Sequence, residues 1–231
     1  MKRLILICTT FFMMFVSSAS AAQKLTLADV TGSKFAPKVV SGINPIEGTD
    51  TYARISDDGK RIVTYSFKTG RELSVLFDVN NTMGEKISSF DGYTMSPDGT
   101  RLLIQTKTNY IYRRSYTAVH YIYTIASRKL ERLSDGGPQQ VPTWSSDGQQ
   151  VAFVREGNIF LVKLLYDNAE IQVTKDGKFN EVINGIPDWV NEEEFGFNRA
   201  LTFNADGTML CWIRYDESKV KTYSLQMYKG M

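Results

Sequence analysis

The chain repeats one pattern of polar and hydrophobic positions four times. Each copy places a polar lead-in before Asp-Gly, then about two polar residues, then a run rich in β-branched and aromatic residues. Asp-Gly favours a tight turn, because glycine accepts positive φ and aspartate can hydrogen-bond its own backbone. Each copy therefore predicts a hairpin with a short strand before the turn and a longer one after it. The copies are Ile55–Phe67, Met95–Lys107, Trp144–Glu156 and Phe203–Tyr215.

Further strand candidates follow each hairpin and bring each unit to about four strands. The turn residues Asp58, Asp98, Asp147 and Asp206 are separated by 40, 49 and 59 residues, a spacing typical of β-propeller blades. We therefore predict an all-β fold, a partial β-propeller of about four four-stranded blades over residues 46–231, preceded by an extended segment at 22–45. The further candidates are Glu72–Asp78, Tyr121–Ile125, Leu130–Leu133, Asn158–Leu164, Ile171–Val173 and Thr222–Met227.

An acidic run, Asp188-Trp-Val-Asn-Glu-Glu-Glu-Phe195, falls within the longest of these intervals. Three adjacent carboxylates repel one another and either face water or need a cationic partner. Both a solvated acidic turn and a cation-binding site are open on these residues alone. Asp188 is a candidate cap for a short helical turn. Consecutive glutamates lack the alternate spacing of a calcium loop, so we predict no metal site.

The N-terminus has the pattern of a secretory signal peptide at residues 1–21. Lys2 and Arg3 precede the apolar run 4–16 and a small-residue stretch that ends at Ala22, and we expect cleavage after Ala21 or Ala22. The apolar run is short for a bilayer span, so we expect an exported protein (periplasmic, cell-surface or secreted) with no integral membrane span in the mature chain. Loss of the two cations brings the net charge from +2 to zero, which gives no reason to expect a nucleic-acid partner.

Several chemically notable residues have ordinary structural interpretations. His120 is the only histidine in the sequence and lies in a strand pattern, where we expect it to have a structural partner. Cys211 is expected to be a buried, inert thiol. Arg114 is interpreted as a surface residue. The three tryptophans, Trp144, Trp189 and Trp212, are expected in blade cores rather than in ligand contacts.

No catalytic motif is present in the sequence. It has no Gly-x-Ser-x-Gly nucleophile elbow, no Cys/His metal spacing and no phosphate-binding glycine loop, so we predict no catalytic residues, metals or cofactors in this chain. A closed propeller commonly needs more than four blades. We therefore expect this chain to be part of a longer protein.

Two phrases resemble the N-terminal half of the dipeptidyl peptidase IV family of serine peptidases. One is the acidic run followed by the hairpin at 203–215, and the other is the segment Tyr112-Arg-Arg-Ser-Tyr-Thr-Ala118. The resemblance covers the chain from Leu25 onward. It implies an eight-bladed propeller joined to an α/β-hydrolase domain, absent from this chain, that carries the catalytic triad. It also implies removal of N-terminal X-Pro or X-Ala dipeptides from peptides.

The resemblance further implies roles for four residues. Glu193 and Glu194 would bind the substrate α-ammonium, Arg113 would bind the carbonyl of the first peptide unit, and Glu192 would support them. Predicted partners are peptide N-termini and the missing hydrolase domain, and homodimerisation of the full-length enzyme is left open. The chain alone is predicted to have no peptidase activity. The alternative is a non-enzymatic exported propeller that binds peptides or envelope proteins.

Overall fold

The computed structural model describes residues 24–37, 39 and 41–226. The predicted signal peptide therefore lies outside the described residues. The chain divides into two compact units, Met1–Ser41 and Gly42–Met231. No helix among the described residues has the length and apolar character needed to cross a bilayer.

The first unit contains one turn of α-helix, α2 (Leu27–Thr31), followed by the 3-10 turn η2 (Ser33–Phe35). Helix α2 begins with a capping box, in which Thr26 and Asp29 each accept a hydrogen bond from the other's backbone N–H. Lys34 pairs with Asp29 at 2.6 Å. We expected residues 22–45 to be extended. The capping box instead stabilises a helical turn within this segment.

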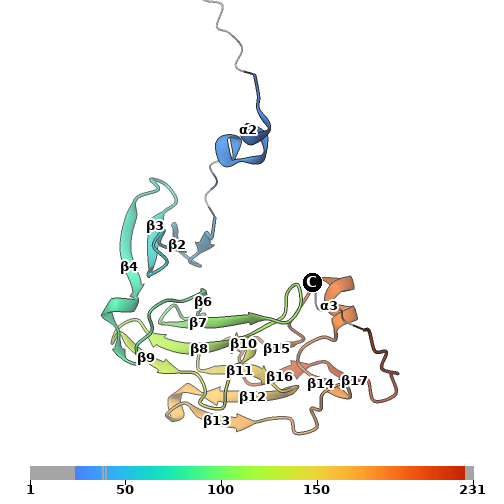
Figure 1. The fold of residues 1–231 in the computed structure, drawn as a ribbon. Coiled ribbons are helices and arrows are strands. Elements are labelled where there is room, and N and C mark those ends of the chain that lie inside the picture. The colour runs from blue at the N-terminus through green and yellow to red at the C-terminus, as the bar shows by residue number, and fades with distance from the viewer. Residues whose placement is uncertain (1–23, 38, 40, 227–231) are drawn as a thin grey trace, which may run out of the picture. The chain divides into compact units, whose positions relative to one another are not determined.

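The second unit consists of consecutive antiparallel sheets that follow one another along the chain (Figure 1). The first sheet has strand order β1-β2-β3-β4, the second β5-β9-β8-β7-β6 and the third β10-β11-β12-β13. In the second sheet β5 is an added outer strand that pairs in parallel with β9. The strands are β1 (Asn44–Pro45), β2 (Thr51–Ile55), β3 (Arg61–Ser66), β4 (Glu72–Asp78), β5 (Met83–Gly84), β6 (Gly92–Met95), β7 (Arg101–Tyr110), β8 (Tyr116–Thr124), β9 (Lys129–Arg132), β10 (Gln140–Trp144), β11 (Gln150–Arg155), β12 (Asn158–Lys163) and β13 (Ala169–Gln172), with 3-10 turns η3 (Val79–Asn81) and η4 (Leu164–Tyr166).

The fourth sheet unit is built from two strand pairs and contains a helix. β14 (Val182–Asn184) pairs with β17 (Arg214–Asp216), and β15 (Leu201–Phe203) pairs with β16 (Leu210–Trp212). Helix α3 (Trp189–Phe195) lies in the connection between β14 and β15. Of the predicted strand Thr222–Met227, residues 222–226 form no strand and pair with none of the described strands, and Met227 lies outside the described residues.

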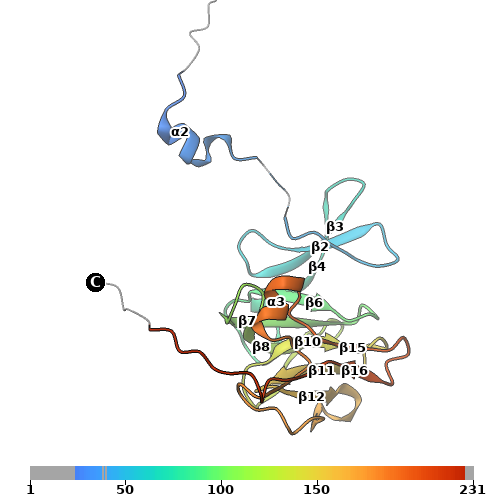
Figure 2. The same cartoon turned by 90° about the vertical axis from the view of Figure 1, so that its right-hand side faces the viewer.

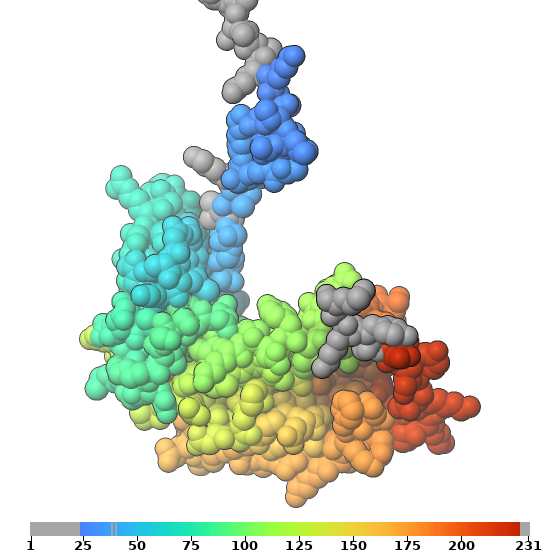
Figure 3. Space-filling model, in the orientation of Figure 1, coloured from blue at the N-terminus to red at the C-terminus, as the bar shows by residue number. Residues whose placement is uncertain are grey.

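The hydrophobic cores lie between successive sheets, which is the packing of propeller blades. Leu102 and Ile104 of β7 contact the first sheet through Phe77, whereas Leu103 faces Phe153 of the third sheet. Ala152 and Val154 of β11 face Leu201 of the fourth. Central strands are thus buried on both faces, which explains why their sequences are continuous apolar runs. The second and third sheets, green and yellow, pack directly together in the space-filling view (Figure 3). The predicted partial propeller is confirmed.

In all four Asp-Gly turns the aspartate Oδ1 accepts the backbone N–H two residues further on. In the first turn Ser56 Oγ also donates to Asp58 Oδ1 at 2.5 Å, and the second and third turns repeat this bond. In the fourth turn asparagine replaces serine, and Asn204 Oδ1 accepts the Met209 N–H at 2.9 Å. The hydrogen bond from Ser56 is the main reason that the pKa of Asp58 is lowered. The turn glycines all have φ between 68° and 74°, so the repeat predicted from the sequence is confirmed in detail.

Three expectations about core residues are wrong. Trp189 is 55% exposed because it begins α3 instead of lying in a blade, and Trp212 is 36% exposed. Cys211 is exposed in the short strand β16, which pairs only with β15 among the described strands. Trp144, by contrast, packs against the core between the second and third sheets as expected.

Candidate functional site

Helix α3 presents the three consecutive glutamates. Asp188 caps its N-terminus by accepting the Asn191 N–H at 2.7 Å, as the sequence predicted. Gly196 ends it in the left-handed conformation, with φ 71°, and donates its N–H to the Glu192 carbonyl. Consecutive helical residues point about 100° apart. The three carboxylates therefore have different surroundings: Glu192 is buried, Glu193 is partly exposed and Glu194 is exposed.

Glu192 connects α3 to the hairpin formed by β7 and β8. Its side chain is only 1% exposed, and its Oε1 accepts the N–H groups of Arg114 and Ser115, both at 2.8 Å. Two successive backbone N–H groups directed at one oxygen form an anion-binding concavity. Hydrogen bonds to an ionised acceptor are also stronger than those between neutral groups. The buried charge of Glu192 is thus compensated by backbone from another blade.

The β7–β8 hairpin carries Arg113 to this helix, and Figure 2 shows α3 beside β7. Its strands have ten and nine residues. Residues 111–115, which we call the hairpin tip, are closed by the Ile111 N–H donating to the Ser115 carbonyl at 2.9 Å. Below the tip, the rings of Tyr110 and Tyr116 lie edge to face with centroids 5.9 Å apart. A long hairpin can therefore present an arginine to a helix 80 residues further along the chain.

Arg113 and Glu193 form an ion pair, with Nε and Oε2 3.1 Å apart. The Arg113 side chain is 73% exposed and that of Glu193 is 25% exposed. An exposed pair of this kind contributes at most about 1 kcal/mol to stability, so a competing ligand can rearrange it at little cost. Glu194 lies next along the helix. One guanidinium with two accessible carboxylates leaves net negative charge, which suits a small cation with several N–H donors.

Of the four residues that the sequence singled out, the structure thus pairs Arg113 with Glu193 and joins Glu192 to the hairpin tip, while Glu194 follows on the same helix. Two further residues, Asn198 and Arg114, make contacts at this site that the sequence did not predict. Asn198 Nδ2 donates to the Arg114 carbonyl at 2.8 Å, and the Arg114 guanidinium lies against Gly196, where a Cβ would be 3.3 Å from Nη2. Arg114 is exposed, as expected, but it is held on several sides. No local pattern marks Asn198, because its partner is 84 residues away in the sequence.

A cleft of about 440 Å³ lies beside the site. His120 lines it but is 2% exposed, and its Nδ1 is 3.0 Å from Oε1 of Gln139, which can only accept, so this ring nitrogen donates. Burial lowers the pKa of His120 to about 4, so the ring is neutral at pH 7. The structural interpretation of His120 is confirmed. The lining residues are Tyr93, Thr94, Leu103, Gln105, Tyr116, His120, Val141, Pro142 and 196–199.

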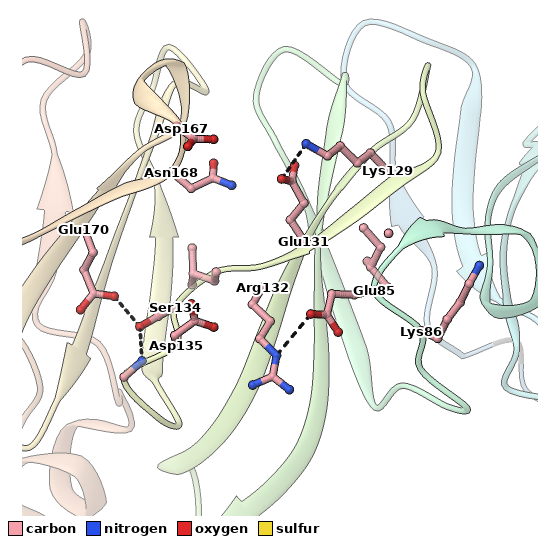
Figure 4. A pocket seen from close by; sticks show the side chains of 14 residues that line it. Glu85, Lys86, Lys129, Glu131, Arg132, Ser134, Asp135, Asp167, Asn168 and Glu170 are labelled. Atoms are coloured by element: carbon pink, nitrogen blue, oxygen red, sulfur yellow. Dashed lines mark hydrogen bonds and ion pairs between the residues drawn. The ribbon is translucent and has the colours of Figure 1, made fainter.

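A second cleft, of about 870 Å³, shares no residue with the first and is lined by β9, the adjoining loop and residues near η4 (Figure 4). Four of its charged side chains form two ion pairs, Lys129 with Glu131 at 2.8 Å and Arg132 with Glu85 at 3.8 Å. Among the described residues, no group of three or more His, Cys, Asp or Glu side chains is arranged to hold a metal ion.

Successive four-stranded blades that carry an acidic helix and an arginine hairpin place the chain in the β-propeller class. A model of the family described as dipeptidyl peptidase IV (DPP IV) N-terminal region matches residues 96–231. The chain belongs to this family, and the predicted resemblance is confirmed. The match includes both the hairpin tip and α3.

Individual relatives agree with this assignment. The chain is 30% identical over 214 residues to prolyl endopeptidase FAP of Homo sapiens, an alignment covering 92% of this chain and 27% of that protein. It is 31% identical over 235 residues to the "Probable dipeptidyl-aminopeptidase B" of Tuber melanosporum, covering 92% of this chain and 25% of that protein. The crystal structure of Porphyromonas gingivalis dipeptidyl peptidase 4 superposes with a TM-score of 0.82 at 34% identity, covering 90% of this chain and 30% of that one. The chain spans about a quarter of the length of these curated relatives.

Proposed function

We propose that this chain is the substrate-orienting propeller part of an exported serine peptidase that removes dipeptides from peptide N-termini. Support for the reaction comes from the family and from relatives named as dipeptidyl peptidases. Support for export is the signal-like pattern of residues 1–21. The catalytic triad belongs to an α/β-hydrolase domain that pairs with this region in the complete enzyme, and the substrates are peptides with Pro or Ala in second position.

The observation that carries the proposal is the ion pair of Arg113 with Glu193, with Glu194 next to Glu193 on the same helix. We call Arg113, Glu193 and Glu194 the ammonium clamp. A substrate α-ammonium offers three N–H donors, which two carboxylates can accept in charge-assisted hydrogen bonds. Arg113, already beside Glu193 at 3.1 Å, then donates to the carbonyl of the first peptide unit. Glu192 holds the hairpin tip from beneath.

The clamp also explains the length of the product. A peptide whose terminal ammonium is fixed at the propeller extends a fixed distance toward the nucleophile, so cleavage falls after a set number of residues. A blocked or internal peptide lacks the ammonium, and the repulsion between Glu193 and Glu194 then remains unrelieved. Selection against the wrong substrates therefore follows from the same two carboxylates.

The test is steady-state kinetics of the full-length gene product with an Ala-Pro chromogenic substrate. Glu193→Gln and Glu194→Gln keep the side-chain shape but remove the charge that attracts the ammonium. We expect each to lower kcat/KM about 10- to 100-fold, the effect of losing a hydrogen bond to a charged group. Glu47→Gln, an exposed glutamate near the first sheet, is the matched control.

Unchanged kinetics in both clamp variants would remove the ammonium assignment. A full-length protein that binds free-amine peptides but turns none over would instead support the non-enzymatic propeller. The two outcomes separate the role of the site from the chemistry of the complete protein.

A further inference from the structure

The hairpin tip is attached to the fourth blade by contacts that surround a single residue, Arg114. Glu192 accepts its N–H at 2.8 Å, Asn198 donates to its carbonyl at 2.8 Å, and its guanidinium lies against Gly196. All three partners belong to one short stretch, residues 192–198, which runs from the middle of α3 to just beyond its C-terminal end. We call these contacts the Arg114 latch.

We infer that Asn198 is a positioning residue of the ammonium clamp, acting through the Arg114 carbonyl to fix the side chain of Arg113. This inference rests on the proposed function. It assigns a role in substrate recognition to a residue outside the acidic run and outside the arginine segment.

The position of Asn198 suits this role. Two residues later, Ala200 is buried and its N–H donates to the Gly185 carbonyl at 2.9 Å, while its carbonyl accepts the Ile213 N–H at 2.9 Å. Asn198 therefore projects from backbone that follows α3 and is anchored to the fourth blade two residues further on. A side chain on such a support can hold a flexible partner in place.

The hairpin tip needs such support. The tip is closed by its own backbone hydrogen bond, but it lies beyond Tyr110 and Tyr116, the last paired residues of β7 and β8. The Arg113 side chain is 73% exposed. Glu192 accepts the N–H groups of Arg114 and Ser115, which belong to the two peptide planes that flank the Arg114 Cα. Asn198 holds the Arg114 carbonyl, so together they restrain rotation of the residue that follows Arg113. A preorganised arginine loses less freedom when substrate binds.

The chemistry of the bond indicates which variant is informative. The carboxamide of Asn198 donates to a carbonyl, whereas the carboxylate in Asn198→Asp has the same shape but can only accept and would repel that oxygen. Asn198→Ser is a milder second variant that keeps a donor on a shorter side chain. Asn80→Asp, an exposed asparagine in η3, adds the same charge elsewhere and is the matched control.

We expect Asn198→Asp in the full-length protein to lower kcat/KM for the free-amine substrate about 3- to 10-fold, mainly through KM, which is the range for one neutral hydrogen bond. Asn198→Ser should fall between it and the parent. The decisive readout is a double-mutant cycle with Glu193→Gln. Once the clamp has lost Glu193, adding Asn198→Asp should lower kcat/KM less than about twofold, because positioning Arg113 then matters less.

A merely structural role predicts a different result, in which Asn198→Asp costs the same factor in both backgrounds and lowers Tm in proportion. That additive outcome, or a silent Asn198→Asp beside an impaired Glu193→Gln, would overturn the latch and leave the clamp intact. Silent Glu193→Gln and Glu194→Gln variants together would overturn both the ammonium clamp and the latch that acts through it.

Discussion

Glu192, Glu193 and Glu194 show how three identical neighbours acquire different surroundings. The sequence predicts their run, the Asp188 cap and the helical turn, because these depend on residues within one turn. The burial of Glu192 depends on N–H groups 77 and 78 residues away. No local pattern carries that information, and for the same reason Asn198 could not be predicted.

His120 gives a prediction for the pH dependence of stability. Its pKa is lowered to about 4 in the folded protein, first by burial, against 6.5 in the unfolded chain. The unfolded state therefore binds the extra proton, and stability is complete above about pH 6.5 and falls as the pH drops toward 4. We expect about 2 kcal/mol to be lost between pH 7.5 and pH 5.

Apparent Tm values at the two pH values, for the parent and for His120→Asn, check this expectation. Asparagine can still donate to Gln139 but does not titrate in this range, so the acid-induced decrease in Tm should be smaller in the variant. Because the sequence has a single histidine, an equal decrease in both proteins would contradict the account.

At the scale of elements, the Asp-Gly turns do more than reverse the chain. Asp98, fixed in place by Ser96 and Thr100, lies against Gly148 of the next turn, where a Cβ would be 3.2 Å from the Asp98 Cγ. Asp147 contacts Gly207 in the same way. The turns of neighbouring blades therefore touch one another, a contact that the repeat pattern alone does not reveal.

A pair of glycines isolates the contribution of this contact to stability. Gly99 and Gly148 have the same φ of 69°, but only Gly148 has an atom within 4 Å of an added Cβ. Alanine at either position has the cost of a left-handed backbone, about 1–2 kcal/mol. Gly148→Ala should be the more destabilising by roughly 0.5–1 kcal/mol, because the hydrogen-bonded Asp98 cannot easily move away.

Differential scanning calorimetry of Gly99→Ala and Gly148→Ala compares the decreases in Tm that the two substitutions cause. Equal decreases in Tm would mean that the contact between turns adds nothing. A larger decrease for Gly99→Ala would contradict the proposed packing outright.

Some strands could be predicted from the hydrophobic pattern of the sequence, and others could not. Strands β3, β7 and β11 were predictable because their apolar runs are buried on both faces by neighbouring blades. The short strand β5 was missed, since two residues carry no periodicity. Trp212 and Cys211 lie in a sequence as apolar as the other hairpins, yet they are exposed, because burial depends on a neighbouring element and not on the strand itself.

At the scale of the whole molecule, the chain is part of the propeller region of the dipeptidyl peptidase IV family. The site that we propose is shared between blades: the second blade supplies Arg113 and the fourth supplies the glutamates. A propeller suits such a site, because rigid blades hold residues from distant parts of the chain at fixed separations. The hydrolase chemistry that we propose is the contribution of a separate domain.

The central claim is that Glu193 and Glu194 recognise a positively charged peptide N-terminus. The most direct measurement compares, in the full-length protein, the inhibition constants of an Ala-Pro amide and of its desamino counterpart, in which hydrogen replaces the amine. We predict that the ammonium compound binds at least about 100-fold more tightly, from two charge-assisted hydrogen bonds. This preference should largely disappear in the Glu193→Gln/Glu194→Gln double variant. Equal affinities of the parent protein for the two compounds would contradict the account.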